Sequence, residues 1–487
     1  MSLDQSTFEH TQRDGRLART KIVATIGPAS EACIGELIEA GMRVARINFS
    51  HGEADEHRRR VELIRKEASE RQVAVGILAD IQGPKLRLGL FEGGTRELRV
   101  DEPLELAEGD GVSGEGEALL NFAGFINTVE VGHRVYLADG MVEVEVKKVE
   151  DGRAFGIVTR GGWIGDRKGV HLPDTELAIR MPTPKDVVDI ALARSMEVDM
   201  IGVSFVGDAN DLRAVRKMAP QQLMVAKIER SAALMNLEEI LEETDGIMVA
   251  RGDLGVETPL EKLPLVQKDL IDRALKAGKF TITATEMLES MVTAARPTRA
   301  EVADVANAVL DGTDAVMLSA ETAVGAYPVR AVECMQEIAL SMEASDRYAR
   351  LSRVAFREAE PSFSNGTALA AVQAARALSI RHIVCFTETG NTARQLSRYR
   401  PRAMVIALTP HRRTQQALSA LGHVRPLLFE RRDNLEHMLS DASSLLVERG
   451  ICTIGEQVVM VAGVPPGMAR TTNVMKLHHI GEVSSLS

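Results

Sequence analysis

Short apolar runs rich in β-branched residues recur along the chain, and amphipathic helical segments separate them. The helical segments include Glu31–Ala40, Glu53–Glu70, Pro184–Arg194 and Pro264–Lys276. Strands that alternate with helices predict a parallel sheet. Eight such units are the number that closes a (β/α)8 TIM barrel, so we expect an α/β protein built around one. The eight apolar runs are Lys21–Gly27, Val44–Phe49, Ala74–Ile81, Met200–Val206, Leu223–Glu229, Gly246–Ala250, Phe280–Ala284 and Ala315–Ser319.

The alternation breaks twice, which divides the chain into predicted domains. Residues 1–19 form a polar N-terminal segment, and residues 20–86 and 182–346 make up the barrel. Residues 87–181 hold Gly- and Glu-rich turns between short alternating strands, which predicts an inserted β-barrel-like domain. Such an insertion would lie over the catalytic face of a barrel and could act as a lid. Residues 360–487 restart the alternation and predict a C-terminal α/β sheet domain.

Charge and cysteine usage exclude several classes of protein. The net charge of −11 argues against nonspecific binding to nucleic acid. No apolar run approaches the roughly 18 residues of a membrane span, and the N-terminus lacks the apolar core of a secretory signal. The four cysteines, Cys33, Cys334, Cys385 and Cys452, are far apart and form no CxxC pair. We therefore expect free thiols in a protein of the reducing cytoplasm.

Polar and charged residues gather at the ends of the predicted strands. In a barrel these positions share one mouth, however far apart they are in sequence. One such charge is usually solvated or ion-paired, but charges at all eight ends together indicate a site for anions and metal ions. We interpret Asp55-Glu56-His57, by contrast, as a solvated helical face. The strand-end residues include Arg46, Asn48, Ser50, His51, Asp80, Lys85, Arg87, Ser204, Lys227, Glu229, Asp253, Thr285, Ser319 and Glu321.

The residue types at these ends suit phosphoryl transfer. Glu229 and Asp253 supply hard oxygen ligands for Mg²⁺ or Mn²⁺. Arg46, Arg87 and Lys227 can neutralise phosphate oxygens, which is most of what catalysis of this reaction requires. Because the chain has no GxxxxGK[ST] loop, side chains and metal would have to bind a nucleotide.

Long motifs make the chain closely similar to the pyruvate kinases from Thr20 to about Asn473. The resemblance implies transfer of the phosphoryl group of phosphoenolpyruvate to ADP, giving pyruvate and ATP in glycolysis, with allosteric regulation and a homotetramer. It implies no nucleic-acid or membrane partner. The matching motifs are Thr20–Ser30 (TKIVATIGPAS), Arg46–Gly52 (RINFSHG), Lys168–Pro173 (KGVHLP), Ala250–Glu257 (ARGDLGVE), Arg296–Glu301 (RPTRAE) and Met317–Ala323 (MLSAETA).

The same resemblance implies a role for each matching residue. Catalytic roles fall on Lys227, Thr285, Arg46, Ser319 and Glu321. Phosphoenolpyruvate contacts fall on Arg46, Lys227, Gly252, Asp253 and Thr285. Nucleotide contacts fall on Asn48, Phe49, Ser50, His51, Arg87 and Lys168, the last in the inserted lid. The divalent-metal ligands are Glu229 and Asp253, and the monovalent-ion ligands are Asn48, Ser50, Asp80 and Ile81.

The strand-three motif departs from the family pattern. Many members need K⁺ as well as Mg²⁺, and they commonly carry Glu in place of Lys85 and Thr in place of Ile81. The Lys85 ammonium would lie close to the position of the ion. We therefore expect Mg²⁺ or Mn²⁺ to be required and K⁺ to be dispensable. Glu286, where relatives often have Gln, is a second departure, and we assign it no role.

A loop of the C-terminal domain carries the features of a phosphate site. It comprises Thr387, Glu388, Thr389, Gly390, Asn391 and Thr392, before a predicted helix. In relatives this loop holds an activator phosphate. Because Glu388 replaces a basic residue, the pattern favours a sugar monophosphate or AMP over fructose 1,6-bisphosphate. The basic stretches Arg398–Arg402 and His411–Arg413 either add to this site or are solvated or subunit-interface residues.

Two other functions fit part of the pattern. A metal-dependent lyase or aldolase acting through a pyruvate enolate would share Glu229 and Asp253 but would not need Lys168. A catalytically inactive metabolite sensor would use the C-terminal domain alone, and the intact set Lys227, Glu229, Asp253 and Thr285 argues against it. Formation of ATP distinguishes the kinase from both.

Overall fold

The computed structural model describes residues 17–175, 181–350, 361–432, 434–464 and 472–482. The predicted N-terminal segment 1–19 therefore lies almost wholly outside the described residues. Contacts divide the chain into two compact units. The first unit comprises Met1–Ala45, Glu62–Gly76 and Met287–Ser487, and the second comprises Arg46–Val61 and Ile77–Glu286. The described residues contain no helix with the length and apolarity that crossing a bilayer requires.

The predicted barrel is present and closed. Its strands follow the order β1-β18-β17-β16-β15-β14-β3-β2 around the barrel, and each overlaps a predicted run. The strands are apolar because a parallel sheet covered by helices is buried on both faces. Their bounds are β1 Lys21–Thr25, β2 Met42–Asn48, β3 Gly76–Asp80, β14 Met200–Val203, β15 Leu223–Ile228, β16 Gly246–Ala250, β17 Phe280–Ala284 and β18 Ala315–Leu318.

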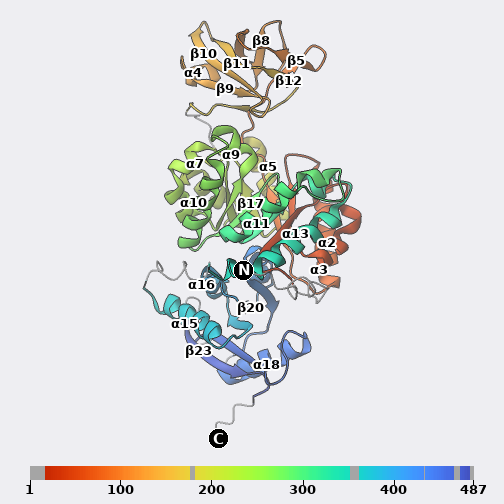
Figure 1. Cartoon of the computed structure of the whole chain (residues 1–487), viewed down its shortest axis with the longest axis vertical. Coiled ribbons are helices and arrows are strands. Elements are labelled where there is room, and N and C mark those ends of the chain that lie inside the picture. Colours follow the sequence, from red (N-terminus) through yellow and green to blue (C-terminus); the bar gives the residue numbers. More distant parts are fainter. Residues whose placement is uncertain (1–16, 176–180, 351–360, 433, 465–471, 483–487) are drawn as a thin grey trace, which may run out of the picture. The chain divides into compact units, whose positions relative to one another are not determined.

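Helices connect the barrel strands (Figure 1). Three begin with capping boxes, at Thr183, Asp208 and Thr298, where a side chain satisfies the first free N–H groups of the helix. The helices are α2 Ile34–Ala40, α3 Ala54–Glu70, α5 Pro184–Ser195, α6 Ala209–Met218, α7 Ser231–Met235, α8 Leu237–Glu243, α9 Arg251–Glu257, α10 Leu263–Lys276, α11 Arg299–Asp311, α12 Ala320–Ala323 and α13 Pro328–Glu343. Short 3₁₀ turns are η1 Glu31–Cys33, η2 Glu289–Val292 and η3 Tyr348–Arg350.

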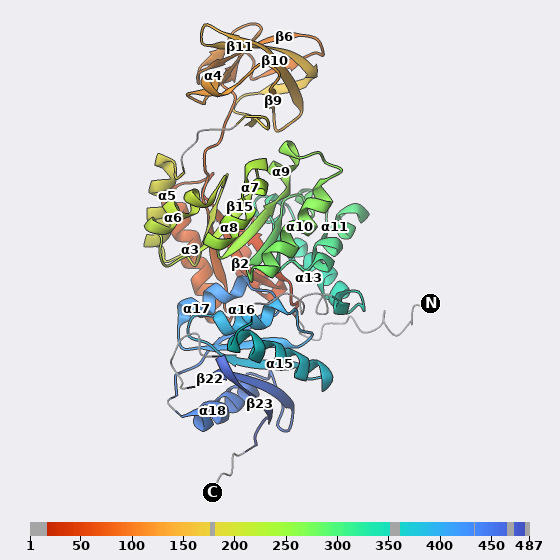
Figure 2. The ribbon, with the colours of Figure 1, turned by 90° about the vertical axis from the view of Figure 1, so that its left-hand side faces the viewer.

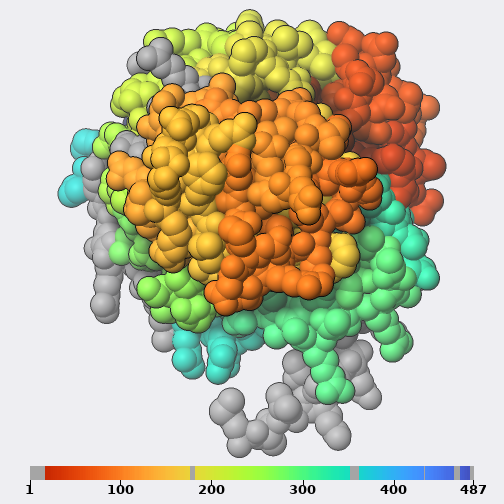
Figure 3. All heavy atoms as spheres, turned by 90° about the horizontal axis from the view of Figure 1, so that it is seen from above, coloured from red at the N-terminus to blue at the C-terminus, as the bar shows by residue number. Residues whose placement is uncertain are grey.

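The insertion between β3 and α5 forms a β domain with its own core, which includes Leu106, Phe125 and Val144. Its main sheet has the order β13-β9-β10-β11-β6-β8. In Figure 3 the insertion, coloured orange, forms one continuous body. Its elements are β4 Leu90–Phe91, β5 Thr95–Leu98, β6 Pro103–Glu108, β7 Val112–Ser113, β8 Glu117–Leu120, α4 Phe125–Thr128, β9 Arg134–Leu137, β10 Val142–Glu150, β11 Arg153–Arg160, β12 Gly162–Gly165 and β13 Val170–His171.

The C-terminal residues form a five-stranded sheet of order β21-β20-β19-β22-β23. Figure 2 labels two of its strands, β22 and β23. Helix α18 packs against it through Leu439, Ala442 and Leu446. The sequence pattern did not predict α17 or the last strand, β23, which runs antiparallel to β22. The elements are α15 Phe363–Ala377, β19 His382–Phe386, α16 Asn391–Arg398, β20 Met404–Thr409, α17 Arg412–Ala417, η5 Leu418–Ala420, β21 Val424–Leu428, α18 Leu435–Glu448, β22 Gln457–Gly463 and β23 Thr472–His479.

All four cysteines are free, as the sequence predicted. Cys334, Cys385 and Cys452 are buried, and Cys33 is partly exposed.

Candidate active site

Lys227 is the centre of a buried charged cluster in the second unit. It lies near the carboxyl end of β15, and its Nζ is 2.7 Å from Glu229 Oε1 and 3.2 Å from Asp80 Oδ1. The third Nζ donor reaches Ser204 Oγ at 2.7 Å. Burial by itself lowers the pKa of Lys227, but Asp80 and Glu229 outweigh it and hold that pKa above its ordinary value. The ammonium is therefore charged and fixed in place.

Arg46 and Asp80 join the cluster from the neighbouring strands β2 and β3. Arg46 donates to Asp80 Oδ2 through Nε at 2.8 Å and Nη2 at 2.5 Å. Burial raises the pKa of Asp80, but Lys227 and Arg46 reverse that effect and bring the pKa below its usual value. Asp80 thus holds both cations in position and stays ionised.

Glu229 and Asp253 have the properties of a divalent-metal pair. Glu229 is almost fully buried, and its Oε2 accepts the Phe205 N–H at 2.7 Å. Burial, reinforced by the negative charge of Asp253, raises the pKa of Glu229 to about 7. Asp253, in the first turn of α9, is only partly buried. Two carboxylates that repel one another, one of them buried, fit a hard divalent cation bound between them.

The end of β17 is held in an unusual backbone conformation. Thr285 and Glu286 have positive φ angles of 67° and 54°, which residues other than glycine rarely adopt. Arg251, which follows β16, stabilises this turn by donating to Ala284 O at 3.2 Å and Thr285 O at 2.6 Å. The Thr285 hydroxyl accepts the Gly252 N–H at 2.8 Å. The contacts of Arg251 thus fix the reactive end of strand seven.

Ser319 and Glu321 follow β18 in the first unit. Glu321 is completely buried, and its two oxygens accept the N–H groups of Ser319 at 2.6 Å and Leu288 at 3.2 Å. Glu321 therefore ties together the loops that follow β17 and β18.

The residues predicted to bind nucleotide lie in two places, the end of β2 with the segment that follows it and the inserted domain. Asn48 ends β2, Ser50 and His51 lie in the β2–α3 loop, and Asn48 Oδ1 accepts the Ser50 N–H at 3.1 Å. Burial first, and then the positive charges of Lys85, Arg87 and Arg46, lower the pKa of His51. These cations thus act together on this loop, as an anionic ligand requires.

Phe49 is held in place through both its ring and its backbone N–H. The ring is buried and stacks on His57, with centroids 4.5 Å apart, while the Phe49 N–H donates to Asp80 O at 2.9 Å. His57 is itself buried, so our interpretation of Asp55-Glu56-His57 as a wholly solvated face is wrong at that residue. The stacked pair instead fixes the loop that carries Asn48 and Ser50.

Arg87 and Lys168 belong to the inserted domain. The Arg87 guanidinium donates to Arg167 O at 2.7 Å, and its N–H donates to Asn121 Oδ1 at 2.7 Å. Lys168 is exposed, and its carbonyl accepts the Leu88 N–H at 2.9 Å. The backbone around Lys168 is therefore fixed while its ammonium faces solvent.

The predicted monovalent-ion ligands are largely engaged within the protein. Both oxygens of Asp80 contact Arg46 or Lys227. The Ile81 carbonyl accepts the Ser204 hydroxyl at 2.7 Å. Lys85 is partly buried, and burial followed by the charge of Lys227 lowers its pKa. The charges of Asp253 and Glu229 also act on Lys85, so its ammonium lies in the field of these two carboxylates.

The predicted effector loop in the first unit precedes α16. Gly390 has a φ of 85°, and a Cβ there would lie 3.0 Å from Leu418, so glycine is required. Thr387 and Thr392 are buried, and their hydroxyls contact the Gly390 N–H and Thr472. Thr389 is exposed and Asn391 partly so, which leaves these two side chains beside the start of the helix.

Glu388 in this loop is paired with two basic side chains. Its carboxylate accepts Arg431 at 3.1 and 2.7 Å and contacts His411 Nε2 at 2.7 Å. Burial opposes its charge, but the hydrogen bonds from Arg431 and His411 together hold the pKa of Glu388 below its usual value. Of the nearby basic residues, Arg400 is buried in an ion pair with Asp314 at 2.8 Å, so it serves the fold.

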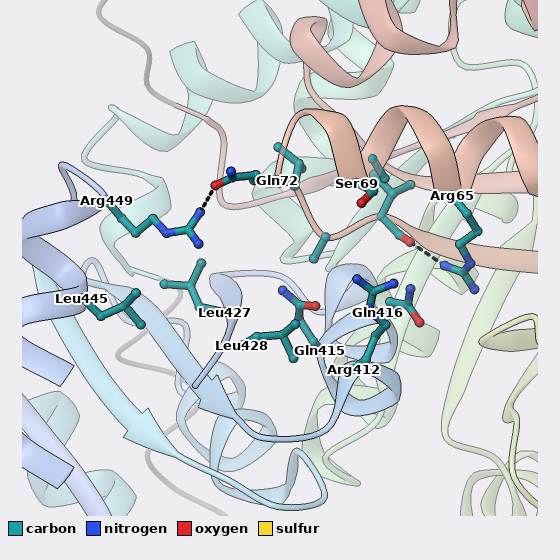
Figure 4. Close-up of a pocket in the computed structure, with 14 residues that line it drawn as sticks. Arg65, Ser69, Gln72, Arg412, Gln415, Gln416, Leu427, Leu428, Leu445 and Arg449 are labelled. Atoms are coloured by element: carbon teal, nitrogen blue, oxygen red, sulfur yellow. Dashed lines mark hydrogen bonds between the residues drawn. The ribbon is translucent and has the colours of Figure 1, made fainter. Parts of the chain in front are cut away.

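A pocket of the first unit is lined by residues of α3, of the segment before β3 and of the C-terminal sheet domain (Figure 4). Leu427, Leu428 and Leu445 from the C-terminal sheet domain form its apolar part, and Arg449 donates to the Gln72 side chain across it. None of the predicted site residues lines it.

Sequence reasoning assigned no role to two residues that organise the site. Ser204 orients Lys227, and Arg251 fixes the turn at Thr285. Both lie just after a barrel strand, a signal that marked Ser204 as a strand-end residue but gave it no role.

Comparison with known proteins agrees with the fold. The pyruvate kinase barrel-domain family matches residues 17–332, and the pyruvate kinase alpha/beta-domain family matches residues 365–478. A pyruvate kinase of Staphylococcus aureus (strain MRSA252) is 42% identical over 96% of this chain and 81% of its own length. That of strain bovine RF122 is 41% identical with the same coverage. The crystal structure of a pyruvate kinase from Cryptosporidium parvum matches with a TM-score of 0.90 and 34% identity, covering 95% of this chain and 96% of that one.

The two family matches together span most of the sequence, and the relatives align along nearly all of it. The closed barrel, the inserted β domain and the C-terminal α/β domain agree with them. This chain belongs to the pyruvate kinase family.

Proposed function

We propose that this chain transfers the phosphoryl group of phosphoenolpyruvate to ADP at the buried cluster around Lys227. The observation that carries the proposal is the triple anchoring of Lys227 Nζ by Asp80, Glu229 and Ser204. A cation fixed before the reaction needs no reorganisation when negative charge develops, which is the main requirement of this chemistry.

In the first step an oxygen of the ADP β-phosphate attacks phosphorus, and the bond from phosphorus to the enol oxygen breaks. Arg46 neutralises the phosphoryl oxygens, and Lys227 stabilises the charge left on the enolate oxygen. Asp80 pairs with both Arg46 and Lys227 and so fixes the positions of the two cations relative to one another. Gly252 and Thr285 lie beside the substrate, which the absence of a side chain at Gly252 lets approach the backbone closely.

Glu229 and Asp253 would hold the Mg²⁺ or Mn²⁺ ion that the family uses. When bound, the ion supplies positive charge that offsets phosphate and enolate oxygens. The fit rests on the raised pKa of the buried Glu229 carboxyl, which a nearby cation would lower again.

In the second step the enolate carbon takes a proton and becomes the methyl group of pyruvate. We place proton delivery on the side of Thr285, with Ser319 and Glu321 supporting the adjoining loop. Because the threonine hydroxyl is a weak acid, the proton passes through water that the hydroxyl orients.

The inserted domain serves as a lid in this proposal, within the domain boundaries predicted above. Arg87 and Lys168 bring positive charge to the phosphates of the nucleotide, with Asn48, Ser50 and His51 on the barrel side. Closure would exclude water and so prevent loss of the phosphoryl group to hydrolysis.

We further propose that Lys85 makes K⁺ dispensable. Its ammonium acts on Asp253 and Glu229, and the carboxylate of Asp80 is already paired with two cations. A monovalent ion would therefore add a charge that the chain already supplies. Activity in potassium-free buffer should be near maximal, and activation of tenfold or more by KCl would contradict this assignment.

The regulation and the assembly that we propose for this chain follow those of the family. We propose that a sugar monophosphate or AMP binds at Thr389, Asn391 and the start of α16, that the active form is a homotetramer, and that it works in the cytoplasm. The pairing of Glu388 with Arg431 and His411 supports a single phosphate, because these cations are already partly neutralised.

The reaction itself is tested by measuring pyruvate and ATP together from phosphoenolpyruvate, ADP and Mg²⁺. The proposal requires both products in equal amounts and their loss when the divalent ion is chelated. Pyruvate without ATP would favour a lyase, and ADP binding without turnover would favour an inactive sensor.

A further inference from the structure

Three side chains that the catalytic reaction does not use converge in the C-terminal domain. His382 begins β19, and the segment between α18 and β22 carries Cys452 and Glu456. His382 Nδ1 lies 3.1 Å from Glu456 Oε1 and 3.5 Å from Cys452 Sγ. The three ligand atoms all lie within 4.8 Å of one another.

One proton on His382 Nδ1 cannot satisfy all of these contacts. If Nδ1 is protonated it can donate to Glu456, and the thiol hydrogen is then left to find another acceptor. If Nδ1 is unprotonated it can accept from the thiol, but it then faces the lone pairs of the carboxylate at 3.1 Å. An ion that accepts a lone pair from each of the three atoms removes this conflict.

The nitrogen–oxygen and nitrogen–sulfur separations match those of a tetrahedral zinc site. Zinc lies at about 2.3 Å from cysteine sulfur and about 2.0–2.2 Å from histidine nitrogen and carboxylate oxygen. A tetrahedral angle then places nitrogen and oxygen roughly 3.3 Å apart and nitrogen and sulfur roughly 3.5 Å apart. The observed values are 3.1 and 3.5 Å.

The surrounding backbone holds the ligands in place. The Thr453 N–H donates to Glu456 Oε2 at 3.1 Å, which leaves Oε1 directed at His382. The Cys452 N–H donates to Leu446 O at 3.2 Å. Arg381 also reaches Glu456 Oε1, but its side chain is 64% exposed and can turn into solvent. His382 and Arg381 line a cavity of about 1090 Å³, through which an ion could enter.

We propose that His382, Cys452 and Glu456 bind a Zn²⁺-class ion, with water as the fourth ligand. Thiolate and imidazole favour zinc over the Mg²⁺ of the catalytic site. As the sulfur–metal bond forms, the thiol proton passes to solvent, and the thiolate and carboxylate together neutralise the ion. The bound ion would join the start of β19 to the α18–β22 segment and so stabilise the C-terminal domain.

The test uses Co²⁺ as a spectroscopic probe of the chelator-treated full-length protein. A cobalt–thiolate charge-transfer band in the near ultraviolet should saturate at one ion per chain and disappear when Zn²⁺ is added. The band should be absent in Cys452→Ser. In His382→Gln the affinity for Co²⁺, measured from the band, should fall at least tenfold. It should persist in Cys334→Ser, a matched buried cysteine, and in Glu229→Gln, which impairs the catalytic metal site.

Thermal melting provides a second readout that does not depend on colour. Zn²⁺ should raise the Tm of the wild type and of Cys334→Ser but leave that of Cys452→Ser unchanged. The assignment is overturned if the wild type shows no cobalt–thiolate band, or if the band survives Cys452→Ser. It is also overturned if Zn²⁺ shifts the Tm of wild type and Cys452→Ser equally.

Discussion

Ser204 should control the rate of the reaction although it is not expected to touch the substrate. Its hydroxyl accepts one of the three hydrogen bonds of Lys227 Nζ and donates to Ile81 O, both at 2.7 Å. Replacement of Ser204 by alanine removes the first bond and leaves the ammonium held by Asp80 and Glu229 alone. Lys227 would then move towards the two carboxylates and away from the substrate oxygen.

The size of the effect follows from the kind of bond that is lost. A hydrogen bond to a charged group contributes about 1.5–3 kcal/mol. At about 1.36 kcal/mol for each factor of ten, its full loss in the transition state lowers the rate by roughly 10- to 150-fold. Because Lys227 acts on charge that develops during the reaction, we expect the loss in kcat, with KM for phosphoenolpyruvate changed less than threefold.

Steady-state kinetics of Ser204→Ala, with pyruvate formation coupled to a dehydrogenase, would measure this loss. Ser195→Ala is the matched control, because the residue is exposed and its hydroxyl donates to Leu192 O at 2.7 Å. Melting of both variants would separate a positioning effect from loss of the fold. A kcat for Ser204→Ala within twofold of the wild type, or a rise in KM alone, would refute the reasoning.

Three further predictions concern cations, the effector loop and acid stability. Lys85→Glu should create activation by KCl of at least tenfold, measured as the ratio of kcat with and without the salt; an unchanged ratio would count against the role of Lys85. Glu388→Gln should remove the negative charge beside Arg431 and His411 and lower the activator concentration for half-maximal effect several-fold; no change for any sugar monophosphate or AMP would remove the effector site. His423 is buried, and burial followed by the charges of Arg400 and Arg19 lowers its pKa well below 6.5. The unfolded chain therefore gains a proton near pH 6.5 that the folded chain cannot accept, so stability is complete above that pH and falls by up to about 1.4 kcal/mol per pH unit below it. The Tm measured from pH 8 to pH 5.5 should fall less steeply in His423→Gln; parallel curves would show that other groups dominate.

The barrel was predictable because its signals are local. Each strand is an apolar run of a few residues, and a polar residue after it marks its end, as Glu229 does after β15. The C-terminal strand β23 was missed because it is only partly buried, and its sequence, TNVMKLHH, mixes polar and apolar residues. Its antiparallel pairing with β22 depends on tertiary contacts that local propensity does not report.

Which partners the site residues have could not be read from the sequence. The resemblance indicated Lys227, Glu229 and Asp253 as functional, but it did not show that Ser204 completes the contacts of Lys227. Pairings across long separations, such as Glu388 with Arg431, arise only when distant segments fold together. The cluster of His382, Cys452 and Glu456 was likewise invisible, because its spacing matches no metal-binding motif and β19 supplies one ligand alone.

The central claim is that Lys227 stabilises charge during phosphoryl transfer, and Lys227→Met tests it most directly. Turnover of phosphoenolpyruvate and ADP with Mg²⁺ should be measured for wild type and variant, together with phosphoenolpyruvate binding and melting. The account predicts rapid formation of pyruvate and ATP by the wild type and a loss of at least roughly a thousandfold in a folded variant. A folded Lys227→Met protein that retains more than a tenth of the wild-type turnover would contradict the account.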